Sequence, residues 1–343
     1  MKHLLNTLYI TTQGTYLHQE GETVMVRVEN EVRLKLPIHT LGGIVCFGLV
    51  TCSPPLLGLC AERGVAVSFL SEHGKFRAAV HGPVSGNVLL RRAQYRCADS
   101  MEQSARLARN MVIAKMANCR TVALRAARET DQPETSQRLR DTAAILAGKM
   151  RRLKRLEPLN VIRGQEGEAA KYYFSIFDDL ICAQKEDFQF HKRTRRPPLD
   201  KVNTLLSFVY TLLTHDMRSA LESVGLDPAV GYLHRDRPGR PSLALDMIEE
   251  LRPAIADRLV LSLINRRQVQ PKGFIQTETG AVTMDDDTRK EVLVAYQKRK
   301  QEVIEHPFLK EKIQIGLIPH VQALLLARTL RGDLDQYPPF FWR

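Results

Sequence analysis

Carboxylate and imidazole side chains occur in the C-terminal half of the chain at spacings that suit a metal ion. Glu166 stands in a Gly-Gln-Glu-Gly-Glu-Ala-Ala run, and His234 ends a Gly-Tyr-Leu-His sequence. Asp246 and Glu249 are three residues apart, so on a helix both project from one face, about one turn apart. Oxygen and imidazole ligands of this kind can hold Mn²⁺ or Mg²⁺, the ions that serve phosphodiester chemistry. These residues therefore predict an open site that polarises a phosphoryl oxygen or activates a hydroxyl group.

Each of these side chains also has a purely structural interpretation. Glu166 at a helix N-terminus would complement the helix dipole, an effect of about 0.3–1 kcal/mol. A single histidine on a loop is more often a hydrogen-bonded polar group than a ligand. Glu249 could belong to an exposed helix face that pairs with Arg252. Spacing alone therefore leaves both a metal site and a helix surface open.

The chain is strongly basic, and its excess charge is concentrated. Its 343 residues include 50 Lys and Arg against 38 Asp and Glu, a formal charge of +12. Residues 91–163 hold seventeen of the basic and seven of the acidic residues, which leaves about +10 in one stretch. A second basic run occupies residues 192–196. A solvated helix face is the alternative for any single helix, but this concentration predicts binding to a polyanion, with nucleic acid the first candidate.

The sequence favours a soluble, cytoplasmic protein. The first twelve residues are too short and too polar for a signal sequence, and Pro54 and Pro55 interrupt the most apolar run. The cysteines form no Cys-x-x-Cys pair, so we expect free, buried thiols. They are the six residues Cys46, Cys52, Cys60, Cys97, Cys119 and Cys182.

Residue periodicity predicts an α+β protein with two domains. Residues 23–28 and 32–36 alternate apolar and polar side chains on either side of a short connection, which predicts a hairpin. Residues 1–86 are expected to form a β-rich, sandwich-like domain, and residues 87–343 an all-α domain. Further strands are expected at 8–10, 15–18, 44–47, 65–70 and 76–81, with a helix at 55–63. Helices are expected at 88–128, 135–156, 166–181, 200–224, 242–264 with Ser242 as its N-cap, 287–305 and 310–331. The aromatic end, residues 335–343, is not helical and docks on this chain or on a partner.

Three ordered blocks of residues stand out in the C-terminal half of the chain. Residues 166–174 read Glu-Gly-Glu-Ala-Ala-Lys-Tyr-Tyr-Phe. Residues 195–208 read Arg-Arg-Pro-Pro-Leu-Asp-Lys-Val-Asn-Thr-Leu-Leu-Ser-Phe, and residues 231–253 run from Gly-Tyr-Leu-His to Glu-Glu-Leu-Arg-Pro. These blocks resemble the motif blocks of the universal CRISPR-associated endonuclease, the integrase of CRISPR adaptation. The length and the Pro-Pro-Phe-Phe-Trp ending resemble the subtype I-C branch of that family.

The resemblance implies a metal-dependent DNA integrase and endonuclease. Glu166, His234 and Glu249 would bind Mn²⁺ or Mg²⁺, and Asp246 would support them. A 3′-hydroxyl at the end of a DNA fragment would attack a phosphodiester at a repeat boundary of the CRISPR array, and with water as the nucleophile the same site would be a nuclease. The candidate DNA contacts are Lys171, which stands where the family commonly has arginine, together with Arg195, Arg196, Arg237 and Arg240.

The resemblance also implies partners. The family forms a homodimer through the β-rich domain, and two dimers bridge the small second CRISPR-associated protein in a hetero-hexamer. In subtype I-C it further implies a nuclease partner with an iron–sulfur cluster. Two other functions stay open, a nuclease of branched or single-stranded DNA and a non-catalytic nucleic-acid-binding scaffold. In the scaffold, Glu166, His234 and Glu249 would lie apart.

Overall fold

The computed structural model describes residues 5–72, 74, 76–80, 82 and 88–342. The chain divides into two compact units, Met1–Ser85 with Met284–Gln301 and Gly86–Thr283 with Glu302–Arg343. The predicted boundary at residues 86 and 87 lies outside the described residues. The first unit contains β-sheets and the second is mainly helical, so the predicted α+β fold class is confirmed.

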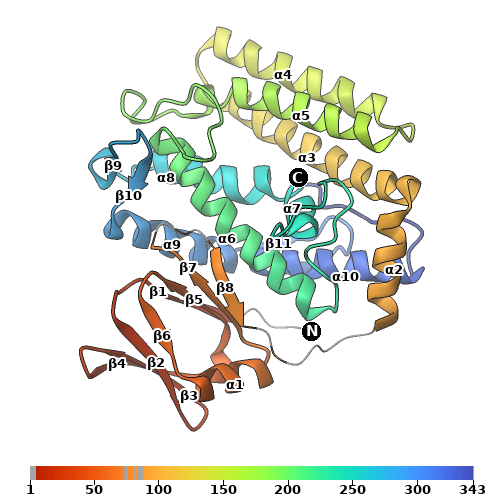
Figure 1. Ribbon diagram of the computed structural model, residues 1–343. Helices are drawn as coiled ribbons and strands as arrows, with labels where there is room; N and C mark the ends of the chain where they lie inside the picture. The colour runs from red at the N-terminus through yellow and green to blue at the C-terminus, as the bar shows by residue number, and fades with distance from the viewer. Residues whose placement is uncertain (1–4, 73, 75, 81, 83–87, 343) are drawn as a thin grey trace. The chain divides into compact units, whose positions relative to one another are not determined.

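Two four-stranded sheets build the first unit (Figure 1). One sheet consists of β1 (Asn6–Ile10), β5 (Leu41–Phe47), β7 (Ala66–Leu70) and β8 (Phe76–Val80), in that spatial order. The other consists of β4 (Glu31–Pro37), β3 (Thr23–Val28), β2 (Thr15–Glu20) and β6 (Val50–Cys52), and α1 (Pro54–Glu62) follows β6. Strands β1, β5 and β7 are parallel, as are β2 and β6. Leu17, Val24, Ile44 and Leu56 from these elements are fully buried in one shared core.

The predicted hairpin is confirmed as β3 and β4. Glu29 and Asn30 connect the two strands with positive φ angles of 50° and 67°. Two residues in this conformation match the twist of the strands they join, which is why such turns are common in hairpins. Glu31, which the sequence left in the connection, is the first residue of β4.

Helix α9 (Asp286–Gln301) belongs to the first unit, although the sequence placed it in the helical domain. Its Gln297 Nε2 donates a hydrogen bond to the carbonyl of Thr7 at 3.2 Å. Val292 and Tyr296 of the helix are buried. The apolar spacing that predicts a helix does not say which distant segment will cover its apolar face, and here that segment includes β1.

Eight helices are described in the second unit. They are α2 (Val88–Asp99), α3 (Met101–Glu129), α4 (Pro133–Arg152), α5 (Leu159–Ser175), α6 (Lys201–Ser223), α7 (Ser242–Ile248), α8 (Arg258–Asn265) and α10 (Ile318–Arg331). Helices α3, α4 and α5 run side by side (Figure 1).

Two small two-stranded sheets were not predicted, β9 (Phe274–Gln276) with β10 (Val282–Met284) and β11 (Val303–Glu305) with β12 (Lys312–Gln314). Within the described ranges, no helix is long and apolar enough to cross a membrane.

The stretch predicted as one helix over residues 88–128 is two helices. Helix α2 ends at Asp99, and the Ser100 hydroxyl accepts a hydrogen bond from the amide of Gln103 at 3.3 Å at the start of α3. Serine favours this capping position because its side chain satisfies an amide that the helix leaves without a partner. The absence of Gly and Pro therefore hid a helix boundary.

Helix α5 begins at Leu159, seven residues before Glu166, and not at Glu166 as predicted. Gly164 and Gly167 lie inside the helix. Burial of one helix face, by Leu159, Ile162 and Ala169, stabilises the helix despite these two glycines. Glu166 is therefore an interior residue of the helix. The interpretation of Glu166 as a carboxylate that complements a helix N-terminus is wrong, since that effect fades after the first turn.

The helix predicted over residues 242–264 is interrupted. Helix α7 starts at Ser242, so Pro241 occupies the capping position and the prediction of Ser242 as N-cap is wrong. After α7 ends at Ile248, a π-helical segment over Arg252–Asp257 leads into α8. Pro253 has no amide hydrogen to donate to the carbonyl of Glu249, so a regular helix cannot continue there. Wide helical turns of this kind are common at functional sites.

All six cysteines are free thiols. Cys46, Cys60, Cys97 and Cys119 are buried, as predicted, whereas Cys52 is half-buried. Cys182 is exposed, so the prediction of a buried thiol is wrong there.

Candidate metal centre

The ammonium group of Lys115 joins the carboxylates of Glu166 and Glu249. Lys115 lies in the middle of α3, Glu166 in α5, and Glu249 directly after α7. Lys115 Nζ forms an ion pair with Glu166 Oε1 and lies 2.5 Å from Glu249 Oε2. The side chains of Lys115 and Glu249 are only 9% and 3% exposed, while that of Glu166 is 23% exposed. The structure therefore brings two of the predicted ligands together around one cation at the edge of the buried interior.

Glu249 is held as a carboxylate by two cations. Burial by itself raises the pKa of Glu249, but Arg252 and Lys115 lower it by more, to about 2. Arg252 donates a hydrogen bond to Glu249 Oε1 at 2.5 Å, and its guanidinium lies 4.9 Å from the centre of the Tyr210 ring. Burial likewise lowers the pKa of Lys115, but Glu249 and Glu166 raise it to above its ordinary value. The site is thus a network of paired charges.

Asp246 orients His234. Asp246 Oδ2 accepts hydrogen bonds from the amides of Tyr232 at 2.6 Å and Leu233 at 2.8 Å. Oδ1 accepts from the amide of His234 at 2.9 Å and lies 2.5 Å from its Nδ1 atom. Because a carboxylate only accepts hydrogen bonds, Nδ1 carries the proton, and Nε2 is the ring nitrogen that a metal ion could use as a ligand. Asp246 is fully buried and both its oxygens are engaged by the loop, so its position suits support of the ligand rather than ligation.

The donors fit a divalent cation. His234 is close enough to Glu249 to be one of the groups that lower the pKa of Glu249, after Arg252 and Lys115. Glu249 Oε2 is buried and lies 2.5 Å from the ammonium of Lys115. A buried anionic oxygen calls for a cation, and Lys115 supplies that charge here. In the part of the chain that the structure describes, no three His, Cys, Asp or Glu side chains already converge as a ligand set. Each of the three candidate ligands instead has a partner within the chain. Glu166 pairs with Lys115, Glu249 with Arg252, and His234 with Asp246.

Gly231 is required for the close approach of this loop to α7. A Cβ atom at Gly231 would lie 2.7 Å from Asp246 Oδ2 and 2.8 Å from the carbonyl carbon of Ser242. Gly231→Ala is therefore expected to destabilise the protein by about 1–3 kcal/mol and to displace Asp246 from His234. Thermal unfolding measures the first effect, and loss of metal binding the second. Gly167→Ala is the matched control, since nothing lies within 4 Å of its added Cβ. An unchanged melting temperature of Gly231→Ala would contradict the prediction.

Four of the predicted DNA contacts form an arginine cluster of Arg195, Arg196, Arg237 and Arg240. Burial lowers the pKa of Arg240, and the charges of Arg237, Arg196 and Arg195 lower it further. The first three side chains are exposed, and Arg240 is half-buried. Asp246 also acts on the pKa of Arg240, so the cluster lies beside the loop that carries His234. Like charges gathered in one place repel one another, and this favours a site that receives phosphates.

The loop of Arg195 and Arg196 is fixed by the start of α6. Asp200 Oδ1 accepts a hydrogen bond from the Asn203 amide at 2.7 Å and so caps the helix. Asn203 then accepts from the Thr194 amide at 3.0 Å and donates to the Lys192 carbonyl at 2.8 Å. The Asp and Asn of the second motif block therefore position a basic loop.

Lys171 is not brought to the carboxylates. It is exposed on α5, five residues after Glu166 and therefore about 140° around the helix from it. Its charge acts instead on Glu168, which pairs with Lys149 of α4 at 2.5 Å. Lys171 thus belongs to a different face of α5 from the candidate metal centre.

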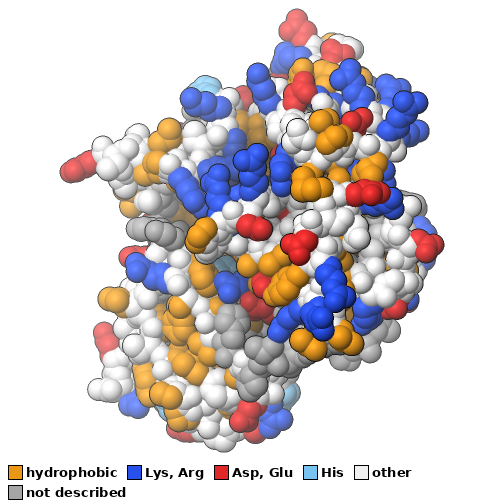
Figure 2. All heavy atoms as spheres, turned by 45° about the vertical axis from the view of Figure 1, so that its right-hand side comes forward, with side chains coloured by type: hydrophobic (Ala, Val, Ile, Leu, Met, Phe, Trp, Pro, Cys, Tyr) orange, Lys and Arg blue, Asp and Glu red, His pale blue; other side chains and the backbone are white. Residues whose placement is uncertain are grey.

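Basic side chains are spread over the surface of the helical unit. Of the seventeen Lys and Arg residues at positions 91–163, all but Lys115 and Lys149 are at least partly exposed. Figure 2 shows lysine and arginine side chains gathered on one face of this unit. The concentration of charge that the sequence revealed is therefore available to a polyanion.

The C-terminal segment docks on its own chain, a point that the sequence left open. The buried carboxylate of Glu250 accepts hydrogen bonds from the Tyr337 hydroxyl at 2.6 Å, Gln322 Nε2 at 2.8 Å and the Phe340 amide at 3.1 Å. Burial raises the pKa of Glu250 more than these hydrogen bonds lower it, to about 7. Asn118 of α3 donates to the carbonyl of Phe340 at 2.9 Å and to that of Glu250 at 2.6 Å. The C-terminal segment therefore fixes Glu250, which directly follows the candidate ligand Glu249 in the chain.

Comparison with known proteins decides the family. The family model of CRISPR associated protein Cas1 matches residues 8–298. The chain belongs to the Cas1 family. A CRISPR-associated endonuclease Cas1 of Chlorobaculum tepidum is 59% identical to it over 343 residues, all of both chains. A fusion of a CRISPR-associated exonuclease Cas4 with an endonuclease Cas1, from Geobacter sulfurreducens, is 34% identical over 340 residues, which cover 98% of this chain and 60% of the fusion.

Solved structures agree with the Cas1 fold. A casposase bound to its integration product has a TM-score of 0.84 at 22% identity, covering 99% of this chain and 95% of the casposase. A chain of a Cas6-RT-Cas1–Cas2 complex has a TM-score of 0.82 at 21% identity, covering 99% of this chain and 36% of the other. At these identities the likeness concerns the fold alone.

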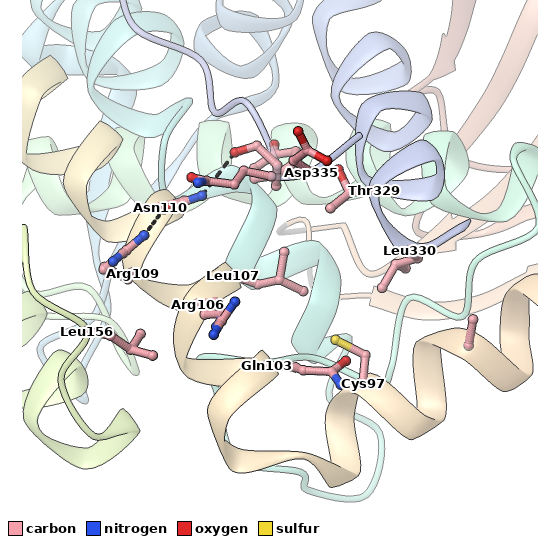
Figure 3. Close-up of a pocket in the computed structure, with 13 residues that line it drawn as sticks. Cys97, Gln103, Arg106, Leu107, Arg109, Asn110, Leu156, Thr329, Leu330 and Asp335 are labelled. Carbon is pink, nitrogen blue, oxygen red and sulfur yellow. Dashed lines mark hydrogen bonds between the residues drawn. The ribbon is translucent and has the colours of Figure 1, made fainter. Parts of the chain in front are cut away.

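A separate pocket of about 450 Å³ in this Cas1 chain lies between α2, α3, α10 and the C-terminal segment. Arg106, Arg109 and Asn110 of α3 line it (Figure 3). Tyr337 of the C-terminal segment is a further lining residue. Asn110 Nδ2 donates to the carbonyl of Tyr337 at 3.1 Å. The candidate ligands are not among its described lining residues, so the pocket is distinct from the metal centre.

Sequence reasoning missed Lys115 and Asn118 in this Cas1-family chain. Both are buried on α3, in a stretch that also buries Met111, Val112 and Met116. The available signal was a lysine and an asparagine, three residues apart, on an apolar helix face, where an unpaired charge is costly. That signal predicts a partner for each residue but cannot name it.

Proposed function

We propose that this Cas1-family chain is a divalent-metal-dependent DNA integrase and endonuclease that inserts DNA fragments into a CRISPR array. The observation that carries the proposal is the meeting of Glu166 and Glu249 at one cation, with His234 oriented beside them and the arginine cluster adjacent. This arrangement favours chemistry at a phosphodiester. The scaffold alternative expects these side chains to lie apart, and the shared ammonium of the two carboxylates weighs against it.

Glu166, Glu249 and Nε2 of His234 would hold Mn²⁺ or Mg²⁺, a donor set that suits these ions. The bound ion would supply charge stabilisation at a phosphoryl oxygen and lower the pKa of the attacking hydroxyl group. Asp246 holds the imidazole in the correct tautomer and orientation. Arg252 fixes Glu249 through Oε1 and leaves Oε2 facing the site. The arginine cluster would bind the phosphates that flank the reacting bond and keep the strand in register.

The nucleophile distinguishes two activities of the same site. A 3′-hydroxyl at the end of a fragment gives strand transfer, and water gives hydrolysis. The name of the Chlorobaculum tepidum relative supports the endonuclease. A casposase bound to its integration product shares the fold, and this is in line with strand transfer as an activity of the same site.

Partners follow from the same proposal. We expect a homodimer through the β-rich unit and a hetero-hexamer with the small second protein, Cas2, in line with the Cas1–Cas2 complex among the fold relatives. The fusion of exonuclease Cas4 to a Cas1 endonuclease in Geobacter sulfurreducens supports a partner nuclease, which the resemblance to subtype I-C describes as an iron–sulfur protein.

A strand-transfer assay tests the function. The purified chain, with Mn²⁺, is incubated with a labelled DNA fragment that has free 3′-hydroxyls and with supercoiled plasmid that carries a repeat. Label joined covalently to the plasmid, and lost with a chelator, is the expected result. Cleavage without joining, even with the Cas2 partner added, would favour the nuclease. DNA binding with no metal-dependent chemistry under any of these conditions would reject both activities.

The arginine cluster is expected to dominate DNA affinity near the site. The double variant Arg237→Glu with Arg240→Glu should weaken binding to duplex DNA at least ~10-fold and lower the slope of log affinity against log salt by about 2, because two phosphate contacts are lost. Fluorescence anisotropy over a salt series measures both. Arg266→Glu with Lys272→Glu is the matched control, since both side chains are exposed but outside the cluster. Equal losses in the two double variants would assign the effect to net charge alone.

A further inference from the structure

Lys115 contacts both of the carboxylates that are proposed as ligands of the metal ion. Its ammonium contacts Oε1 of Glu166 and Oε2 of Glu249, one oxygen from each carboxylate. Because the side chains of Lys115 and Glu249 are almost fully buried, bulk water cannot screen the charges well. Without a cation between them, two carboxylates at this separation would repel each other. Lys115 therefore neutralises the pair from within the chain.

A divalent ion and the ammonium cannot both hold these two oxygens. Mg²⁺ binds oxygen at about 2.0–2.1 Å. An ion at that distance from Glu166 Oε1 and Glu249 Oε2 would stand where Lys115 Nζ now lies, and two cations so close repel strongly in a buried site. The lysine side chain has a flexible four-carbon stem, so its head group can withdraw while the helix stays in place.

We propose that Lys115 is a tethered counter-cation of the metal centre, which holds Glu166 and Glu249 together before the divalent ion arrives and competes with that ion for them. This inference rests on the metal site of the proposed function. It makes Lys115 a positioning residue with two opposite effects: it stabilises the metal-free protein, and it weakens metal binding.

A purely structural ion pair gives a different expectation. If Lys115 only tied α3 to α5 and to Glu249, its removal would loosen the carboxylates, and the affinity for metal would fall together with the stability. Competition predicts that the two quantities move in opposite directions. The metal affinity of the whole chain therefore distinguishes the two roles, because removal of a merely structural lysine would not increase it.

The experiment compares Lys115→Met with the unmodified chain after removal of metal by a chelator. Calorimetric titration with Mn²⁺ gives the dissociation constant, and thermal unfolding with and without Mn²⁺ gives the stability. We expect Lys115→Met to melt at a lower temperature without metal, and to bind Mn²⁺ at least ~10-fold more tightly. Lys115→Gln, which keeps a polar head group but no charge, should shift both quantities in the same directions, and it serves if the methionine variant does not fold.

Lys149→Met is the matched control. Lys149 is also buried, with a side chain 7% exposed, and it pairs with a single carboxylate, Glu168, at 2.5 Å. Its replacement should leave the Mn²⁺ affinity unchanged. His234→Ala removes a proposed ligand and leaves Lys115 in place, so it tests the metal site independently of the competition by Lys115. Mn²⁺ binding that depends on His234 but is unchanged or weaker in both Lys115 variants overturns the competition. Absence of any His234-dependent Mn²⁺ binding in the unmodified chain overturns the metal site itself.

Discussion

Replacing His234 with alanine is expected to lower the rate of strand transfer at least ~10³-fold while leaving the affinity for DNA unchanged. The ring offers Nε2 to the ion only because Asp246 holds Nδ1, and alanine removes that ligand altogether. DNA affinity is expected to persist because the arginine cluster binds phosphates without His234. The labelled-fragment assay measures joining, and anisotropy measures binding.

His191→Ala provides the matched control for that variant. His191 is exposed and lies outside the metal centre, before the basic run at residues 192–196, so its loss should leave strand transfer intact. If His234→Ala joined fragments at the rate of the unmodified chain, the site would have to be built from other residues. A loss of DNA binding in parallel with activity would instead point to a folding defect.

Ending the chain at Gln336 is expected to lower the free energy of unfolding by at least ~4 kcal/mol. Tyr337 and Phe340 are both 1% exposed, so their removal empties part of the core. Glu250 would keep only its hydrogen bond from Gln322 and would become a poorly paired buried carboxyl group. Because Glu250 directly follows Glu249, Mn²⁺ binding should weaken as well. Chemical denaturation and Mn²⁺ titration measure the two effects.

Phe341→Ala separates docking of this segment from its general hydrophobicity. Phe341 is 38% exposed, unlike its neighbour Phe340, so its replacement should cost little. Tyr337→Phe removes only the hydroxyl that donates to Glu250. Its loss of unfolding free energy should lie between that of Phe341→Ala and that of the truncated chain. A truncated chain as stable as the full one would show that the segment does not support the site.

The sequence could predict the parts of the fold that local patterns determine. Alternating side chains identified β3 and β4, and helical spacing identified α6, which begins one residue after its predicted start at Asp200. The starts of α3 and α5 were missed for opposite reasons. Ser100 gave a weak signal inside a continuous helical pattern. The predicted start at Glu166 left out residues 159–165, which include Gly164 and which tertiary packing keeps helical.

The candidate site depended on information of a different kind. Glu166, His234 and Glu249 were selected by their likeness to family motifs, since spacing alone left helix-surface interpretations open. Their neighbours could not be selected in that way. Lys115 becomes a partner of both carboxylates only when α3 packs against α5 and the segment after α7, and one-dimensional spacing carries no information about that packing. The same holds for Asn118, whose partners are Glu250 and two residues of the C-terminal segment, Phe340 and Trp342.

The membership of α9 in the first unit has a practical consequence for dissecting the protein. Because residues 284–301 return to that unit, the polypeptide passes from one unit to the other three times. A gene fragment that stops at residue 85 would encode the two sheets without the helix whose Gln297 and Lys300 reach Thr7. Isolating either unit therefore calls for spliced genes. The first unit needs residues 284–301 fused by a linker to residues 1–85, and the second needs a short linker in place of residues 284–301.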